Sequence, residues 1–183
     1  ACKWDSVIPF EPMWEQLKRV IKPNGAIVLF GSEPFSSHLR LSNLVWFKYD
    51  WYWNKGQGLN FVTAKYRPLN DTETISVFGA GKINYYPIME KAKEENMRPA
   101  NKGSKASDIH GSIKIAKSAV DYDGTVRYPK TSIFINSRIA ECNSLHRLHP
   151  TQKPVALMEY LIRTYTNEGE TVLDNCMGSG TTG

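Results

Sequence analysis

Residues 171–183 read TVLDNCMGSGTTG, and this stretch decides the fold class. It opens with a short apolar run, closes that run with Asp174, and then enters a loop that contains three glycines. A short apolar run with β-branched residues predicts a buried strand of a parallel sheet. Glycines after such a strand let the backbone turn tightly and pass close to a ligand at the carboxyl end of the sheet. We therefore predict an α/β fold with a ligand site at this loop.

The loop also matches the pattern G-x-G-x-x-G through Gly178, Gly180 and Gly183. Taken alone, this pattern is a weak signal, because it also occurs in tight strand-to-helix turns that hold no ligand. A dinucleotide site is disfavoured, because there the first glycine follows the strand directly, whereas residues 174–177 intervene here. The choice between a ligand site and a plain turn depends on the neighbouring sequence.

A helix is predicted immediately upstream, over residues 154–165. Thr151 before it and Pro154 in its first turn are typical of a helix start, and Asn167 with Gly169 would end it. Its apolar residues recur at helical spacing, and they are Leu157, Met158, Leu161, Ile162 and Tyr165.

The first part of the chain has a similar organisation. Apolar spacing predicts a helix over 11–22, and the run at 26–30 predicts a strand buried on both faces. Further expected elements are a short helix at 34–43, strands at 45–53 and 74–78, and a loop at 56–72. Aromatic residues crowd the segment 46–53, and we interpret them as core rather than as a base-stacking platform.

Charge is distributed unevenly along the 183 residues. Residues 82–148 hold twelve Lys and Arg against seven Asp and Glu, which accounts for the whole net charge of +5. Much of this segment lacks periodicity, and the run at 133–135 is its one clear strand. A basic irregular segment can attract a phosphate backbone, but its charge alone is more often that of a solvated, lysine-rich loop region, so both interpretations stay open at this point.

Composition excludes two classes of protein. No run of eighteen apolar residues is present, so we expect no membrane span. Three widely spaced cysteines do not form a disulfide scaffold and are typical of a reducing cytoplasm.

Two motifs together indicate a family. Residues 173–183, LDNCMGSGTTG, resemble the cofactor-binding motif of the N6-adenine and N4-cytosine DNA methyltransferases, and residues 149–154, HPTQKP, resemble that family's second cofactor-contacting motif. Segments 22–32, 53–55 and 73–78 are similar to core strands of the same enzymes. The order of motifs is similar to the beta-type arrangement, in which the target-recognition region lies between the two halves.

This resemblance implies a class I methyltransferase fold: a Rossmann-like, doubly wound α/β sheet, incomplete here, with an inserted basic region. It implies a catalytic half at 1–81, target recognition at 82–148 and a cofactor half at 149–183. The implied cofactor is S-adenosylmethionine and the implied partner is double-stranded DNA. A restriction endonuclease that acts together with the enzyme is a further partner that the resemblance allows. The residues implied to contact the cofactor are His149, Pro150, Thr151, Gln152, Lys153, Pro154, Asp174, Gly178, Ser179, Gly180 and Thr181.

The chain departs from the family pattern in two places. Asn175 and Cys176 follow Asp174, where the family motif has Pro and Phe. The catalytic tetrapeptide, Asp-Pro-Pro-Tyr or Ser-Pro-Pro-Tyr, does not occur in the 183 residues. By position it is expected before Ala1, and the acidic residue that holds the cofactor ribose is expected after Gly183, so we expect a chain cut short at both ends.

Candidate DNA contacts follow from this placement. Lys3 and Trp4 would lie in the loop over the target base, and the basic segment contributes Lys102, Lys105 and Lys114. Metal ligation is not expected, because the spacing of Cys142, His146 and His149 offers no fourth ligand. We interpret Cys176 as a small apolar filler rather than a nucleophile.

The expected reaction is methylation of the exocyclic amine of adenine, N6. Three alternatives remain: methylation of cytosine N4, a catalytically inactive DNA-binding relic, and a Rossmann-type enzyme that acts on small molecules. The basic segment disfavours the last of these.

Overall fold

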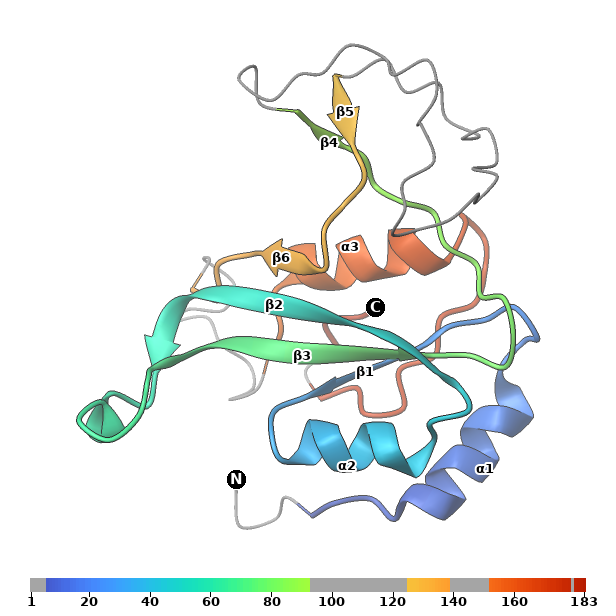
Figure 1. Ribbon diagram of the computed structural model, residues 1–183. Helices are drawn as coiled ribbons and strands as arrows, with labels where there is room; N and C mark the ends of the chain where they lie inside the picture. The colour runs from blue at the N-terminus through green and yellow to red at the C-terminus, as the bar shows by residue number, and fades with distance from the viewer. Residues whose placement is uncertain (1–5, 93–124, 139–151, 179) are drawn as a thin grey trace, which may run out of the picture. The chain divides into compact units, whose positions relative to one another are not determined.

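The computed structural model of the protein describes residues 6–92, 125–138, 152–178 and 180–183. The backbone divides into two compact units, residues 1–86 with 130–183, and residues 87–129. In the second unit the described residues form a two-stranded antiparallel ladder of β4 (Glu90–Lys91) and β5 (Val126–Arg127). The first unit contains the sheet and helices shown in Figure 1. The predicted division at residues 81 and 148 stays a prediction.

The first unit is built on a mixed four-stranded sheet. Its strands are β1 (Ile27–Gly31), β2 (Phe47–Leu59), β3 (Asn70–Phe78) and β6 (Ser132–Phe134), in the order β1-β3-β2-β6. β3 is antiparallel to both β1 and β2, so β1 and β2 run in the same direction, while β6 pairs with β2 in parallel. The carboxyl ends of β1 and β2 therefore point to the same edge of the sheet.

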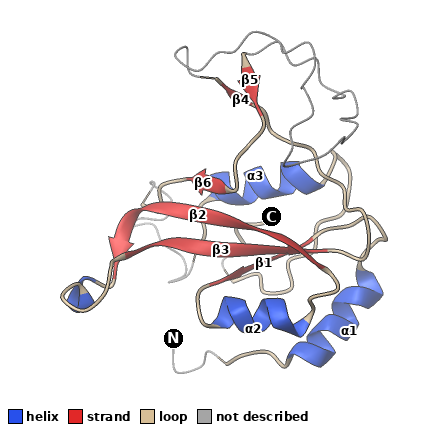
Figure 2. Cartoon of the chain, viewed as in Figure 1, coloured by secondary structure: helices blue, strands red, loops and turns tan. Residues whose placement is uncertain are grey.

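Helices cover both faces of this sheet (Figure 2). α1 (Phe10–Val20) and α2 (Phe35–Ser42) pack on one face, and α3 (Val155–Tyr165) packs on the other. Strand alternation explains the division: Ile27 and Leu29 of β1 join the core under α1 and α2, whereas Val28 and Phe30 join the core under α3. None of the described helices is long and apolar enough to cross a membrane.

The aromatic segment is core, as predicted. Trp51 and Trp53 are 3% and 2% exposed and pack against α3. The indole N–H of Trp51 donates to the Tyr165 hydroxyl at 2.6 Å, and the Tyr49 hydroxyl lies 2.9 Å from the same oxygen. Burial of an indole ring costs free energy unless its N–H has a hydrogen-bond acceptor. The Tyr165 hydroxyl is that acceptor for the buried Trp51 ring.

Two predictions of local structure differ from what is observed. The loop predicted at 56–72 is shorter and spans 60–69, because β2 continues to Leu59 and β3 begins at Asn70; a 3₁₀ turn, η1 (Phe61–Thr63), lies within it. The pair of Leu59 with Asn70 extends both strands into this stretch, although its side chains are polar and lack alternation. Residues 171–174 form no strand, since among the described residues no neighbouring backbone pairs with them. Val172 and Leu173 are accordingly exposed.

Candidate cofactor site

The sequence-predicted motifs meet at a cavity of about 1020 Å³ in the first unit. Its walls include residues 26–30 at and before β1, the faces of α1 and α2 that carry Met13 and Leu39, the face of α3 that carries Leu161, and the segment 171–178. Its lining is predominantly apolar, and its size suits a cofactor, because small-molecule sites usually occupy about 300–1,000 Å³.

The glycine loop gives this cavity backbone walls without side chains. Gly178 and Gly180 have φ angles of +56° and +76°, in the left-handed region that glycine adopts without strain. At Gly178 the nearest neighbour of an added Cβ would be the Cys176 carbonyl oxygen at 3.8 Å, so the space beside the loop is open. This arrangement lets a ligand approach the backbone closely.

Asp174 folds the loop. One carboxylate oxygen accepts from the Cys176 amide at 3.0 Å, and the other accepts from the Thr182 hydroxyl at 2.5 Å. An Asx-type bond of this kind is a common way for aspartate to fix a turn. Asp174 therefore joins the two ends of the glycine loop, and it is also one of the residues that line the cavity.

Lys153 lines the cavity from the start of α3. Its ammonium pairs with one carboxylate oxygen of Glu73 on β3, and the Lys55 ammonium lies 3.0 Å from the other oxygen. The same Lys153 nitrogen lies 5.0 Å from the ring centre of Phe30 and 5.5 Å from that of Trp53. Ammonium groups over aromatic faces are attracted by the ring quadrupole, so Lys153 is fixed by three partners at once.

Glu73 is the buried anion of this cluster, with a side chain 11% exposed. Burial alone would raise the pKa of Glu73, but the charges and hydrogen bonds of Lys153 and Lys55 outweigh it and lower the pKa below its usual 4.5. Glu73 is therefore ionised at neutral pH, and the cluster of one carboxylate and two ammonium groups carries one net positive charge beside the cavity.

The described structure brings together four of the residues predicted for the cofactor: Lys153, Asp174, Gly178 and Thr181. Gln152 precedes them on the same segment, Pro154 is buried as the N-cap of α3, and Gly180 lies in the loop without lining the cavity. The other predicted residues lie outside the described part of the chain: His149, Pro150, Thr151 and Ser179 for the cofactor, and Lys3, Trp4, Lys102, Lys105 and Lys114 for DNA.

Sequence reasoning missed Glu73 and Lys55 as parts of this site. The signal was available, because an acidic residue next to the apolar run of β3 must find a cation if it is buried. The interpretation of Cys176 as a packed filler is wrong: the thiol is free and exposed, since the segment around it forms no strand. Within the described residues no cluster of His, Cys, Asp and Glu could hold a metal ion; Cys142, His146 and His149 lie outside them.

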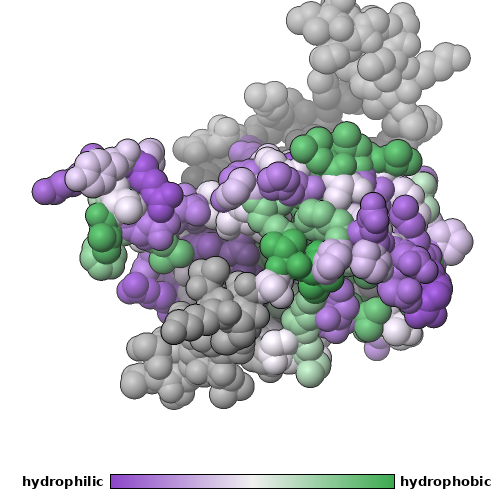
Figure 3. All heavy atoms as spheres, turned by 90° about the horizontal axis from the view of Figure 1, so that it is seen from below, coloured by the Kyte–Doolittle hydropathy of each residue, from purple (hydrophilic) through white to green (hydrophobic). Residues whose placement is uncertain are grey.

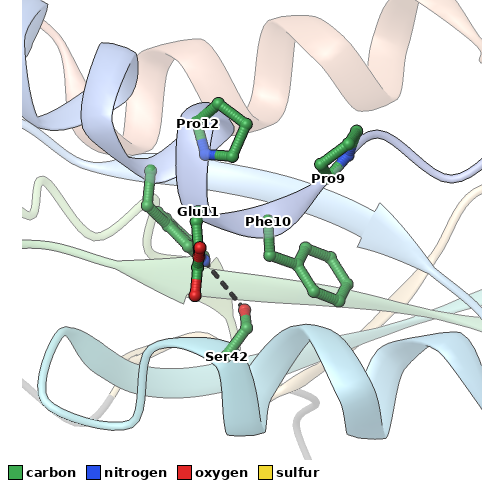
Figure 4. A pocket seen from close by; sticks show the side chains of 6 residues that line it. Pro9, Phe10, Glu11, Pro12 and Ser42 are labelled. Carbon is green, nitrogen blue, oxygen red and sulfur yellow. Dashed lines mark hydrogen bonds between the residues drawn. The ribbon is translucent and has the colours of Figure 1, made fainter.

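A second hollow, of about 440 Å³, lies at the start of α1 (Figure 4). Pro9, Phe10 and Pro12 form much of its wall, and the Trp14 indole N–H donates to the Ser42 hydroxyl at 2.8 Å across the junction of α1 and α2. The hydrogen bond between Trp14 and Ser42 links the two helices, and Glu11 is the one ionisable residue among those that line the hollow. We assign it a structural role.

The sheet, the covering helices and the glycine loop beside an apolar cavity define an α/β domain with a candidate ligand site. Comparison with known families makes this specific, because residues 3–183 match the family model N6_N4_Mtase, described as DNA methylase. The chain belongs to this family of DNA methylases.

Two curated relatives are type II methyltransferases. M.HpaI of Haemophilus parainfluenzae is 26% identical over 185 residues, which covers 97% of this chain and 51% of the relative. M2.DpnII of Streptococcus pneumoniae is 57% identical over 35 residues, or 19% of this chain and 13% of the relative. The chain thus spans about half of the length of M.HpaI.

Solved structures share the fold. The M1.HpyAVI–SAM complex superimposes with a TM-score of 0.60 at 23% identity, over 96% of this chain and 72% of its own. The cytosine-N4-specific PvuII DNA methyltransferase gives a TM-score of 0.53 at 18% identity, over 94% of this chain and 60% of its own. The prediction of a class I methyltransferase fold is confirmed by this likeness.

Proposed function

We propose that the full-length protein methylates the exocyclic amine of a base in duplex DNA, with S-adenosylmethionine as the methyl donor and adenine N6 as the acceptor. The observation that carries the proposal is the meeting of both predicted cofactor motifs at one cavity, through Lys153 and Gly178, in a chain of the DNA methylase family. S-adenosylmethionine, when bound, supplies an electrophilic methyl group.

The residues present fit this cofactor. The apolar walls of β1 and α3 suit an adenine ring, and the open backbone of the glycine loop suits the polar remainder of the molecule. The net positive charge of the Glu73–Lys55–Lys153 cluster favours a carboxylate ligand nearby. M1.HpyAVI, which shares the fold, is a protein with a solved SAM complex.

We propose two sets of cofactor contacts, residues 149–154 and residues 174–181. Asp174 would hold the glycine loop in shape, Gly178 and Thr181 would present the loop to the ligand, and Lys153 would fasten the first set to the sheet through Glu73. Such fixed positioning matters, because an exocyclic amine is a poor nucleophile and must be flipped out and aligned with the methyl group.

The test is an assay of the purified full-length protein on unmethylated duplex DNA with labelled S-adenosylmethionine, followed by digestion to nucleosides and mass spectrometry. We expect N6-methyldeoxyadenosine. N4-methyldeoxycytidine would contradict the adenine assignment and select the second candidate, to which the fold likeness with the PvuII enzyme gives support.

Binding measurements separate the remaining alternatives. DNA binding without methyl incorporation or cofactor binding would overturn the proposal in favour of a DNA-binding relic. Cofactor binding without affinity for DNA would instead favour an enzyme of small molecules. Calorimetry with S-adenosylmethionine and fluorescence anisotropy with a labelled duplex distinguish these outcomes.

A further inference from the structure

A long hairpin extends past the edge of the sheet beside the candidate site. β1 ends at Gly31, which pairs with Thr74, and Thr74 also pairs with Tyr52 of β2. From this row β2 continues to Leu59 and β3 begins earlier, at Asn70, so the two strands project beyond the carboxyl end of β1. Beyond this row β3 has the four residues 70–73, which correspond to roughly 13 Å at about 3.3 Å per residue, and β2 covers the same stretch with seven residues because its ladder with β3 is irregular between Asn54 and Leu59. Figure 1 shows this projection, and we call its residues 56–70 the arm.

The base of the arm touches the candidate site. Trp53 and Glu73 are opposite each other in the ladder, and Glu73 binds Lys153 of the cavity wall. In open α/β sheets, ligands bind at the carboxyl edge of the strands. The arm therefore projects from the edge at which a substrate of this site must arrive.

The tip of the arm is folded tightly. Asn60 adopts a left-handed conformation, with φ of 67°, and the amides of Thr63 and Tyr66 donate to the carbonyls of Asn60 and Thr63 at 3.0 and 2.9 Å. The Thr63 hydroxyl accepts from Arg67 Nε at 2.9 Å and lies 3.0 Å from the Asn60 carbonyl oxygen. The side chains of the tip are thus held on a defined backbone.

This folded tip presents rings and cations to solvent. Phe61, Val62 and Tyr66 are 80%, 77% and 88% exposed. Lys65 and Arg67 flank Tyr66 and are also exposed, and residues 56–70 contain neither Asp nor Glu. Figure 3 shows hydrophobic side chains beside hydrophilic ones at the projecting end. Apolar side chains held in water on a rigid hairpin mark an interaction surface.

We propose that the arm is a DNA-contacting element, with Lys65 and Arg67 on phosphates and Phe61 and Tyr66 against bases or sugars. The inference rests on the proposed function and adds a contact surface to it. Interleaved rings and cations without carboxylates suit a polyanion that carries flat bases. A second copy of the chain is disfavoured, because its own arm would bring like charges to the contact.

The experiment compares paired variants of the full-length protein in duplex binding by anisotropy over a range of salt. Lys65→Glu with Arg67→Glu should weaken binding and make the slope of log K on log salt shallower by about two, since each phosphate contact contributes about 0.9. Arg19→Glu with Arg163→Glu is the charge-matched control, with both residues exposed on helices. The control should leave both the affinity and the slope unchanged.

A second pair tests the rings. Phe61→Ser with Tyr66→Ser should weaken DNA binding about tenfold or more if each ring stacks on a nucleotide. Leu41→Ser with Val45→Ser removes comparably exposed apolar groups, 66% and 88%, away from the arm and should have no effect. Unchanged S-adenosylmethionine affinity by calorimetry would show that every variant is folded.

The outcomes separate the two proposals. Failure of the unsubstituted protein to bind DNA would overturn the proposed function. Normal DNA binding by both arm variants would overturn the role of the arm alone. If an arm variant differs from the unsubstituted protein in molar mass by light scattering but binds DNA with the same affinity, the arm serves self-association, and the proposed DNA contact is overturned.

Discussion

Lys153 and Glu73 form an ion pair between residues 80 positions apart in the chain. The pair fastens the segment before α3 to β3, and Lys55 completes it from β2. Because Phe30 and Trp53 provide faces for the Lys153 ammonium, three strands and one helix start are joined at this point. A substitution here should therefore affect both the stability of the fold and the shape of the cavity.

The first prediction concerns the Glu73 carboxylate, which Lys55 and Lys153 share. Glu73→Gln would leave two ammonium groups adjacent in a half-buried place, and we expect a loss of about 1–3 kcal/mol in the free energy of unfolding. Glu159→Gln is the matched control, because Glu159 pairs with Arg163 at an exposed site and should change stability by about 0.5 kcal/mol or less. Urea unfolding of both variants measures the difference, and equal losses would contradict the special role of Glu73.

The second prediction concerns pH. The folded-state pKa of Glu73 is lowered, so its contribution to stability is present above the unfolded value of about 4.5 and is lost as pH falls through the folded value. The difference in unfolding free energy between the natural protein and Glu73→Gln should be constant from about pH 7 to 5 and shrink in more acidic solution. A difference that grows on acidification would show that the carboxyl is not held ionised by its lysines.

The third prediction concerns the hydroxyl that serves the aromatic core. Burial, together with the hydrogen bond that its hydroxyl shares with Tyr49, raises the pKa of Tyr165, so the hydroxyl stays protonated through the neutral range. Tyr165→Phe removes the acceptor of the Trp51 indole N–H, and we expect a loss of about 1–3 kcal/mol. Tyr66→Phe, at a ring 88% exposed, should be neutral in the same thermal unfolding experiment.

The fourth prediction tests the glycine loop. Gly180→Val forces a β-branched residue into a φ of +76°, and we expect binding of S-adenosylmethionine to be lost in calorimetry on the full-length protein. Gly81→Val is the control, because an added Cβ there meets no atom within 4 Å and its φ is not in the left-handed region. Unchanged affinity in Gly180→Val would contradict the assignment of the loop to the cofactor.

The fifth prediction concerns the basic segment outside the described residues. Joint charge reversal of Lys102, Lys105 and Lys114 should weaken binding to all DNA sequences and flatten the salt dependence, with cofactor affinity unchanged. Anisotropy over a salt series measures this. If the DNA affinity of the natural protein does not depend on salt, the segment is a solvated loop and does not contact phosphates.

The fold could be predicted wherever side-chain periodicity is decided by burial. The helical stripes of α1 and α3 and the apolar run of β1 each face a core, so their patterns are readable in the sequence. The ends of β2 and β3 in the arm were missed because the pair of Leu59 with Asn70 extends the strands while the side chains around it face solvent. The strand predicted at 171–174 failed for the opposite reason: its side chains suit a core, but no backbone beside it completes a ladder among the described residues.

The sequence predicted the glycines of the candidate site, but only some of its other residues. Gly178 and Gly180 have the left-handed φ angles that make glycine necessary, and Lys153, Asp174 and Thr181 line the same cavity. The partner of Lys153 could not be found by spacing, because Glu73 is brought to it by the register of β3 against β2. Contacts that depend on tertiary register leave no local pattern in a single sequence.

The pairing of β2 with β3 is interrupted at the base of the arm. Asn54 pairs with Thr72 and Leu59 pairs with Asn70, so residues 55–58 of β2 lie opposite the single residue Asp71. We therefore expect the pairing of the strands below this irregularity not to depend on the length of the tip. Replacement of residues 60–69 by a short glycine–serine turn should leave the register of the sheet and the melting temperature of the protein nearly unchanged, while it removes the proposed DNA contacts of Lys65 and Arg67.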